Sequence, residues 1–403
     1  MHDVVVIGAG VSGLSCARFL AQEGFSVLVL EKSKEIGGSI SENLQGFPLY
    51  EVSRIGIDVP KNNPVRNLVL MSSREKDLEL NFGKPICYLV MRGSGDSFDS
   101  YLAEQATDAG VEIELNSKAV GVKSNKKRLI SAKTEKGKAF KGRYFVGADG
   151  AFSMTRRIVG LSRLEIKGIS YGMKMENVEV DPLSVRGIFD NKVAPKGYGY
   201  VIGYPDEKFA TVAVSLRPKY ASKNIKEYFR LLLRLIKPIM KNAKDVRSFA
   251  GSVTCNDGSH GVARKNLLFV GEAGGFQDPT FGFGMAPSIR SAAIASHVIS
   301  KSYEKGDLNV LQDYERSVKS RIFGKEIGWK WKFRKMILER MNDKDVDSII
   351  SSFKGDEEAL ERVIDTGNWM LLWRSIFKAI RRRPSLLRHL LHVPLIFLPI
   401  EVS

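Results

Sequence analysis

The fold is decided by the stretch Val4-Val5-Val6-Ile7-Gly8-Ala9-Gly10-Val11-Ser12-Gly13. Its apolar, β-branched start is typical of a buried parallel strand, and the glycines that follow are typical of a turn into a helix. Gly8 permits a tight turn, Gly10 lets the backbone approach a pyrophosphate, and Gly13 lets the helix pack close to the strand. The stretch therefore predicts a dinucleotide-binding βαβ unit.

A second apolar run, Val27–Leu30, follows the helix and ends at an acidic residue. A carboxylate at this point accepts hydrogen bonds from ribose hydroxyls, while the helix N-terminus offers N–H groups and a partial positive charge to phosphates. Besides the three glycines, the residues predicted to contact the nucleotide here are Val11, Ser12, Glu31, Lys32 and Gly38. Glycine spacing alone does not choose between NAD and FAD.

Two later segments also run from a buried strand through a loop into a helix. They are residues 143–157 and residues 266–298. Both strands end at an acidic residue beside a glycine, and these residues are Asp149, Gly150, Gly271 and Glu272.

With these segments the chain resembles the flavoprotein superfamily that contains p-hydroxybenzoate-hydroxylase-like aromatic hydroxylases and geranylgeranyl reductases. Members carry an Asp-Gly motif and a later Gly-Asp motif on either side of one FAD. The resemblance implies that FAD is the cofactor, that Asp149 lies near its pyrophosphate, and that Glu272 replaces the acid that holds the ribityl chain. Glu272 differs from the usual Asp by one methylene group.

Within this superfamily the chain is most similar to the geranylgeranyl reductases, which reduce isolated double bonds of isoprenoid chains, notably in archaeal membrane lipids. Pro279 and Gly282 match a Pro-x-x-Gly run, and Gly284 follows it. Arg92 matches an Arg-then-Phe-Asp element, which implies a place beside the FAD. The loop after Glu31 lacks the cysteine often found in this branch, which indicates a divergent member.

The resemblance implies a reductase in which N5 of the reduced flavin delivers hydride to one alkene carbon while a proton reaches the other. The residues predicted to wall the prenyl channel and form the catalytic site are Tyr198, Tyr200, Tyr204 and Phe281. Backbone N–H groups at the next helix start would favour the anionic reduced flavin, and the residues involved are Gly282, Phe283, Gly284 and Met285. A single dinucleotide site predicts an external electron donor, and ferredoxin, a reductase protein and NAD(P)H all stay open.

Two other classes of function fit the same motifs. A FAD-dependent monooxygenase of an aromatic or lipid substrate would share every FAD motif, and would show NAD(P)H oxidation with O2 uptake. A flavin-binding membrane scaffold without redox activity would bind FAD, but no polyprenyl lipid would reoxidise it.

The order of the motifs predicts an α/β fold with a discontinuous, Rossmann-type FAD-binding domain formed by residues 1–165 and 262–305. Residues 166–261 are expected to form an inserted antiparallel β-sheet lobe for the substrate. Residues 47–91 are expected to add strands to this lobe. Residues 306–403 are expected to form a C-terminal helical region.

The net charge of +17 is unevenly distributed along the chain. Residues 221–243 are predicted to form a cationic amphipathic helix. A second basic region, from Gly367 to Ile400, contains no acid and ends in an apolar tail too interrupted to span a bilayer. Both regions predict docking on an anionic membrane surface, with packing into the fold as the alternative. We expect no nucleic-acid partner, because no nucleic-acid-binding motif accompanies the charge.

Three widely separated cysteines, Cys16, Cys87 and Cys255, fit a reducing cytoplasm. Cys16 is predicted to be a small core residue. Neither the cysteines nor the five histidines have metal-ligand spacing, so no metal site is expected. No signal peptide precedes the first strand, and we expect a cytoplasmic protein with peripheral membrane association.

Overall fold

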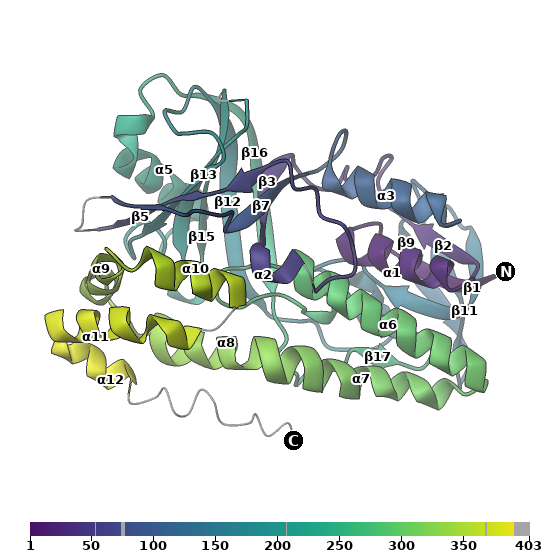
Figure 1. The fold of residues 1–403 in the computed structure, drawn as a ribbon. Helices are drawn as coiled ribbons and strands as arrows, with labels where there is room; N and C mark the ends of the chain where they lie inside the picture. The colour runs from purple at the N-terminus through teal and green to yellow at the C-terminus, as the bar shows by residue number, and fades with distance from the viewer. Residues whose placement is uncertain (53, 74–76, 207, 367–368, 391–403) are drawn as a thin grey trace.

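The structure is a computed structural model. It describes residues 1–52, 54–73, 77–206, 208–366 and 369–390. Figure 1 shows an α/β part around the N-terminus, a β-rich part formed mainly by residues 166–254, and a layer of C-terminal helices that runs beneath both in this view.

The α/β part is built on a mainly parallel sheet with β1 (His2–Ile7) at its centre. β1 pairs in parallel with β2 (Val27–Leu30) on one side and with β11 (Ala139–Gly147) on the other. β8 (Glu112–Glu114) pairs in parallel with β2, and β18 (Leu267–Phe269) with β11. Antiparallel additions are β9 (Ala119–Ser124), β10 (Leu129–Thr134) and β17 (Ala263–Arg264). The carboxyl ends of strands that are far apart in the sequence therefore lie along one edge of the sheet. Cofactors bind at this edge in such sheets.

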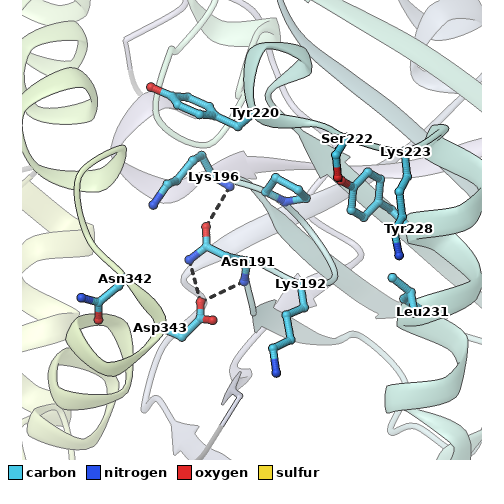
Figure 2. Close-up of a pocket in the computed structure, with 11 residues that line it drawn as sticks. Asn191, Lys192, Lys196, Tyr220, Ser222, Lys223, Tyr228, Leu231, Asn342 and Asp343 are labelled. Atoms are coloured by element: carbon cyan, nitrogen blue, oxygen red, sulfur yellow. Dashed lines mark hydrogen bonds between the residues drawn. The ribbon is translucent and has the colours of Figure 1, made fainter.

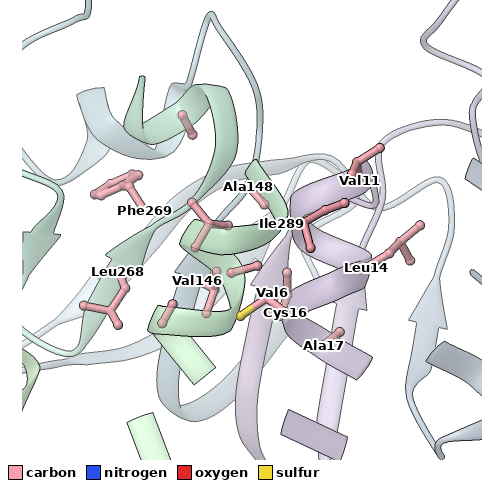
Figure 3. Close-up of a cluster of buried hydrophobic side chains, with 14 of the residues drawn as sticks. Val6, Val11, Leu14, Cys16, Ala17, Val146, Ala148, Leu268, Phe269 and Ile289 are labelled. Atoms are coloured by element: carbon pink, nitrogen blue, oxygen red, sulfur yellow. The ribbon is translucent and has the colours of Figure 1, made fainter. Parts of the chain in front are cut away.

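Helices α1 (Val11–Gln22) and α6 (Met285–Lys305) pack against each other and line the core beside this sheet (Figure 3). Leu14, Cys16 and Ile289 are completely buried there. Burial raises the pKa of the Cys16 thiol to about 12, and the prediction that Cys16 is a core residue is confirmed. The other helices of this part are α2 (Leu49–Val52), α3 (Phe98–Asp108) and α4 (Met154–Ile158).

The β-rich part is a seven-stranded sheet. Across the sheet the strands are β16 (Lys244–Thr254), β12 (Ile166–Glu176), β15 (Phe209–Leu216), β14 (Tyr198–Gly203), β13 (Ser184–Phe189), β5 (Asn67–Ser72) and β6 (Leu78–Asn81). Neighbours are antiparallel except β5 and β13, which pair in parallel. Two strands from early in the chain therefore complete a sheet whose other five strands are inserted between the halves of the α/β part.

Helix α5 (Ile225–Leu235) packs on β12 and β15 of this sheet. Its apolar side chains Tyr228, Phe229 and Leu232 are buried in the core of the β-rich part. The amphipathic pattern predicted for residues 221–243 therefore belongs to the fold, and its basic residues form the solvated outer face. Of the two interpretations left open by the sequence, packing into the core is correct for this helix.

A small third sheet is formed by β3 (Asn43–Pro48), β7 (Cys87–Arg92) and β4 (Pro64–Val65). Leu89 of β7 is buried in one cluster with Ile202 of β14, so this sheet packs against the β-rich part. The sequence predicts that residues 47–91 add strands to the substrate lobe, and two of their strands, β5 and β6, join the seven-stranded sheet.

The C-terminal region is helical where it is described, and it contacts both other parts. Its helices are α7 (Gln312–Val318), α8 (Gly328–Phe333), α9 (Asp343–Ser352), α10 (Glu357–Thr366), α11 (Trp373–Arg382) and α12 (Leu387–Leu390). The backbone widens to π-helix at Lys319–Ile327 and again at Arg334–Leu338. Every helix within the described ranges is too short or too polar to cross a bilayer.

Candidate functional site

The glycine turn after β1 has the shape that a pyrophosphate requires. Gly8 has a φ of +108°, and a Cβ there would lie 2.4 Å from the carbonyl oxygen of Ala148. A Cβ at Gly13 would lie 2.0 Å from the carbonyl oxygen of Gly8, so α1 can approach the turn only because this residue is glycine. A Cβ at Gly10 would meet no atom within 4 Å, so the structure leaves room in front of this residue.

The N-terminus of α1 faces this space, and no protein side chain neutralises the partial positive charge of the helix there. No side chain caps its N-terminus at Gly10, and its first turn, which begins at Val11 and Ser12, contains no acid. The unpaired N–H groups and the positive end of the helix dipole therefore remain available for an anion.

Glu31 lies at the end of β2 beside the turn and is buried. Its Oε2 accepts a hydrogen bond from the Ala9 N–H at 2.8 Å, and its Oε1 accepts one from the Ser33 N–H at 2.9 Å. A carboxylate has about four acceptor positions, so Glu31 retains capacity for ribose hydroxyls. Lys32 and Gly38 are exposed in the following loop.

Asp149 is placed beside the glycine turn, but its carboxylate already has protein partners. A Cβ on Gly8 would lie 3.2 Å from the Asp149 Cα. The carboxylate accepts hydrogen bonds from the Ser153 hydroxyl at 2.6 Å and from the Thr155 N–H and hydroxyl at 2.8 Å. It therefore fixes the turn into α4, in which Gly150 has a φ of +76°.

The Gly271-Glu272 loop closes on the glycine turn from the other half of the sheet. A Cβ at Gly271, which has a φ of +58°, would lie 2.3 Å from the Ser12 hydroxyl oxygen. Burial raises the pKa of the Glu272 carboxyl to about 7, although a backbone hydrogen bond from Thr254 and the charge of Arg92 oppose this effect. A carboxyl in such a place is suited to hydrogen bonds with hydroxyl groups of a ligand.

Arg92 is buried and is fixed by two neighbours. Its Nε and Nη2 donate to the Asp99 carboxylate at 2.7 and 2.8 Å, and its Nη1 donates to the Gln45 Oε1 at 3.1 Å. Arg92 does not face solvent, because the residue is only 8% exposed. Gln45 was not predicted, since its contact depends on the pairing of β3 with β7.

Residues 277–284, which the sequence predicts to face the flavin and which we call the flavin loop, precede α6. Oδ1 of Asp278 accepts hydrogen bonds from the Thr280 N–H at 2.6 Å and the Phe281 N–H at 3.0 Å. A Cβ at Gly284 would lie 1.9 Å from the Gln277 Oε1, so a side chain there would have to displace the Gln277 amide. As at α1, no side chain caps α6 and no acid lies in its first turn, so its N-terminus is open to an anion.

Aromatic side chains of β14 and the flavin loop lie together. The Tyr198 ring centroid is 5.9 Å from that of Tyr200 and 6.3 Å from that of Phe281, and the Tyr198 hydroxyl donates to the Phe281 carbonyl. Phe283 continues the row, with its ring centroid 6.5 Å from that of Phe281. A Cβ at Gly199 would lie 2.7 Å from Leu232 of α5, so the two tyrosines face away from that helix.

Tyr204 stands apart from this row. Its ring packs against Phe209, with the centroids 6.2 Å apart, and its hydroxyl accepts a hydrogen bond from Thr211 at 3.4 Å. The structure therefore brings together three of the four predicted catalytic residues, and Tyr204 follows directly after the end of β14.

The uncapped helix N-termini, the carboxylates of Glu31 and Glu272 and the glycine cradle define a dinucleotide-binding flavoprotein fold with contacts from two distant loops. The chain belongs to the FAD binding domain family, whose model matches residues 72–323. An NAD(P)-binding Rossmann-like domain model matches residues 6–68. The cofactor is FAD, as predicted, and the open space at Gly10 and the carboxyl of Glu272, whose pKa burial raises, fit it.

Curated relatives match over nearly the whole chain. A digeranylgeranylglycerophospholipid reductase of Methanocaldococcus jannaschii is 29% identical, over 96% of this chain and 97% of the relative. The enzyme with the same name from Thermoplasma acidophilum is 27% identical, over 87% of this chain and 90% of the relative.

Solved structures confirm the predicted fold class. A geranylgeranyl bacteriochlorophyll reductase-like protein of Thermoplasma acidophilum has a TM-score of 0.81 and 24% identity, over 97% of this chain and 99% of the neighbour. A flavin-dependent brominase has a TM-score of 0.67 and 16% identity, over 95% of this chain and 100% of the neighbour. At these identities the similarity shows the shared fold.

Proposed function

We propose that this protein is a FAD-dependent reductase that saturates isolated C=C bonds of geranylgeranyl-type isoprenoid chains, in lipids of the membrane. The observation that carries the proposal is the nearly full-length match to two digeranylgeranylglycerophospholipid reductases. The aromatic row beside the flavin loop supports it, because apolar rings are suited to an isoprenoid chain. The flavin-dependent brominase shares only the fold with this chain, at 16% identity.

When bound and reduced, FAD supplies the hydride that the alkene requires. The chain's own residues position the alkene and exclude water. Tyr198 and Tyr200 are expected to wall the channel, and Phe281 to close it on the side of the flavin loop. Burial raises the pKa of Tyr198 to about 12, so its hydroxyl stays protonated and keeps its hydrogen bond to the Phe281 carbonyl at neutral pH. Because an isolated alkene is unpolarised, most of the protein's contribution to catalysis comes from positioning the alkene beside the flavin.

The decisive experiment supplies electrons and an isoprenoid lipid to the purified protein. The flavin is reduced with dithionite, the lipid is added without oxygen, and products are measured by mass spectrometry. We expect a gain of two hydrogen atoms for each saturated bond, with reoxidation of the flavin. Unchanged lipid, together with O2 uptake when NAD(P)H and an aromatic compound are supplied, would instead support the monooxygenase alternative. The same assay with ferredoxin, a reductase protein or NAD(P)H identifies the external donor.

Replacing Tyr200 by alanine is expected to lower reduction of prenyl chains while FAD binding persists. The Tyr200 ring packs beside Tyr198, and its loss removes contacts to the substrate without touching the phosphate turn. We expect kcat/KM to fall roughly tenfold, which corresponds to about 1.4 kcal/mol of lost contact. Tyr200→Phe keeps the ring and serves as the matched control. Equal turnover in Tyr200→Ala would place the channel elsewhere.

We further propose that the protein docks on an anionic membrane surface through α11 and its neighbours. Unlike α5, α11 leaves large apolar side chains exposed: Trp373 is 40% exposed and Phe377 is 64% exposed. Arg374, Arg381 and Arg382 lie on the same helix and are exposed as well. Exposed aromatic rings among cations fit the boundary between headgroups and acyl chains. The apolar tail predicted to contribute, residues 391–403, lies outside the described residues.

Phe377→Ser is expected to weaken cosedimentation with anionic vesicles about tenfold, because burying one phenylalanine contributes roughly 1.5–3 kcal/mol. Vesicle binding of the wild type and of Phe377→Ser should also weaken as salt rises, because salt screens the surface charges. Tyr303→Ser on α6 removes another exposed aromatic and should leave binding unchanged. If Phe377→Ser binds as tightly as the wild type, α11 does not insert into the membrane.

A further inference from the structure

Two cations from the C-terminal region reach the flavin loop. Nζ of Lys330 donates to Oδ2 of Asp278, whose other carboxylate oxygen holds the loop N–H groups. Nη1 of Arg334 donates to the carbonyl oxygens of Pro279 at 2.8 Å and Thr280 at 2.5 Å. Asp278 is 4% exposed and Arg334 is 7% exposed, so these contacts are largely shielded from water.

Arg334 also links the flavin loop to the strand that carries the aromatic row. Its Nη2 donates to the carbonyl oxygen of Lys196 at 2.6 Å, two residues before Tyr198. The Tyr198 hydroxyl in turn donates to the carbonyl of Phe281 in the flavin loop. The Arg334 guanidinium group and the Tyr198 hydroxyl therefore connect the flavin loop to β14 and the segment before it at two separate points.

Lys196 is itself fixed from the other side, at the wall of a cleft of about 670 Å³ (Figure 2). Its N–H donates to Oδ1 of Asn191 at 3.1 Å, and Asn191 donates twice to the Asp343 carboxylate of α9, at 3.0 and 2.6 Å. The Lys196 ammonium donates to the Met341 carbonyl at 2.6 Å. The C-terminal region thus contacts the segment before β14 directly through Arg334 and the Met341 carbonyl, and indirectly through Asp343 by way of Asn191.

The two cations lie where the helical backbone departs from α geometry. Lys330 is in α8, which lies between the two π-helical segments, and Arg334 begins the second of them. Such wide turns are rare and occur frequently at functional sites. Glu339 balances the charge of Arg334 at 3.5 Å and pairs with Arg217 at 3.1 Å.

We propose that Lys330 and Arg334 are positioning residues of the reaction, which hold the flavin loop, and with it the N-terminus of α6 and the aromatic row, in one arrangement. The expected effect on turnover rests on the proposed function, which supplies the substrate. The expected effect on the flavin potential does not depend on it. The C-terminal region then forms the outer support of the active site. A loosened loop would weaken the electrostatic support that α6 offers to reduced flavin.

The test replaces each cation and measures the flavin midpoint potential, the FAD dissociation constant and turnover. Lys330→Met alone leaves Asp278 buried without a counter-charge, so the double variant Lys330→Met/Asp278→Asn is made as well. The introduced amide keeps an oxygen for the loop N–H groups. We expect FAD to bind within about threefold of wild type, a more negative midpoint potential, and at least roughly tenfold lower kcat with little change in KM.

Conservative and remote variants separate positioning from general damage. Lys330→Arg keeps the charge, so its midpoint potential should stay close to the wild-type value. Arg321→Met removes an exposed cation of the first π-helical segment and should not shift the potential. Arg334 and Tyr198 hold the same loop, so the effects of Arg334→Met and Tyr198→Phe on the midpoint potential should be non-additive.

An unchanged potential in both Lys330→Met/Asp278→Asn and Arg334→Met would overturn the proposal. Additive effects of Arg334→Met and Tyr198→Phe would also contradict it, because the two groups would then act independently. If the wild type fails to reduce any isoprenoid lipid while the potential shifts as expected, the proposed function fails and the positioning role stands.

Discussion

Gly10→Val is expected to give a folded protein that no longer binds FAD. Gly10 has a φ of −83° and a ψ of 179°, which valine adopts without strain, and a Cβ there meets no protein atom within 4 Å. The new side chain would therefore fill the space in front of α1 that the pyrophosphate requires. Overpacking of about 3 kcal/mol would weaken FAD binding at least roughly 100-fold. Flavin absorbance after gel filtration measures the loss, and thermal unfolding checks that the fold survives.

Gly13→Val provides the contrast. A Cβ at Gly13 would lie 2.0 Å from the Gly8 carbonyl oxygen, so this variant is expected to damage the packing of α1 on β1 and lower the melting temperature even without FAD. If Gly10→Val purified with one FAD per chain, the turn after β1 would not be the pyrophosphate site. A wild-type protein that released NAD on denaturation would contradict the cofactor assignment more directly.

The nucleotide half of the site could be predicted from sequence because its determinants are local. The turn, the helix start and Glu31 lie within about thirty residues, and Gly8 and Gly13 each have a steric reason for their positions. Even here, the sequence did not show that the Asp149 carboxylate is used by the turn into α4. A motif places a residue near a ligand, whereas hydrogen bonding decides what its side chain does.

The supports of the flavin loop could not be predicted, because they depend on contacts between distant residues. Lys330 and Asp278 are 52 positions apart, and Lys330 lies in no recognisable motif. Amphipathic patterning has a related limit. The apolar faces of α5 and α11 have similar sequence character, yet Phe229 is buried in the core and Phe377 is 64% exposed. Periodicity shows that a helix has an apolar face, but tertiary packing decides what covers it.

The Glu272 carboxyl is expected to make the stability of the FAD-free protein fall as pH rises from about 4.5 to 7. Burial raises its folded-state pKa to about 7, so the folded protein holds this proton more tightly than the unfolded chain does. The resulting stabilisation is fully present below the unfolded pKa and is lost as pH rises through 7. Its size is on the order of 3 kcal/mol for a shift of this kind. Urea unfolding of the FAD-free wild type and of Glu272→Gln, which cannot titrate, should therefore converge at low pH and diverge above pH 5.

FAD binding should show the opposite pH dependence at the same residue. Hydroxyl groups that donate to a carboxylate favour its ionised form, so a ribityl chain held by Glu272 would lower the pKa of this carboxyl. Binding then releases a proton near neutral pH, and the affinity for FAD should rise between pH 6 and 8. Titration of the FAD-free protein in buffers of different ionisation enthalpy measures that proton. Glu272→Gln should abolish the proton release, and release that persists in this variant would assign the linkage to another group.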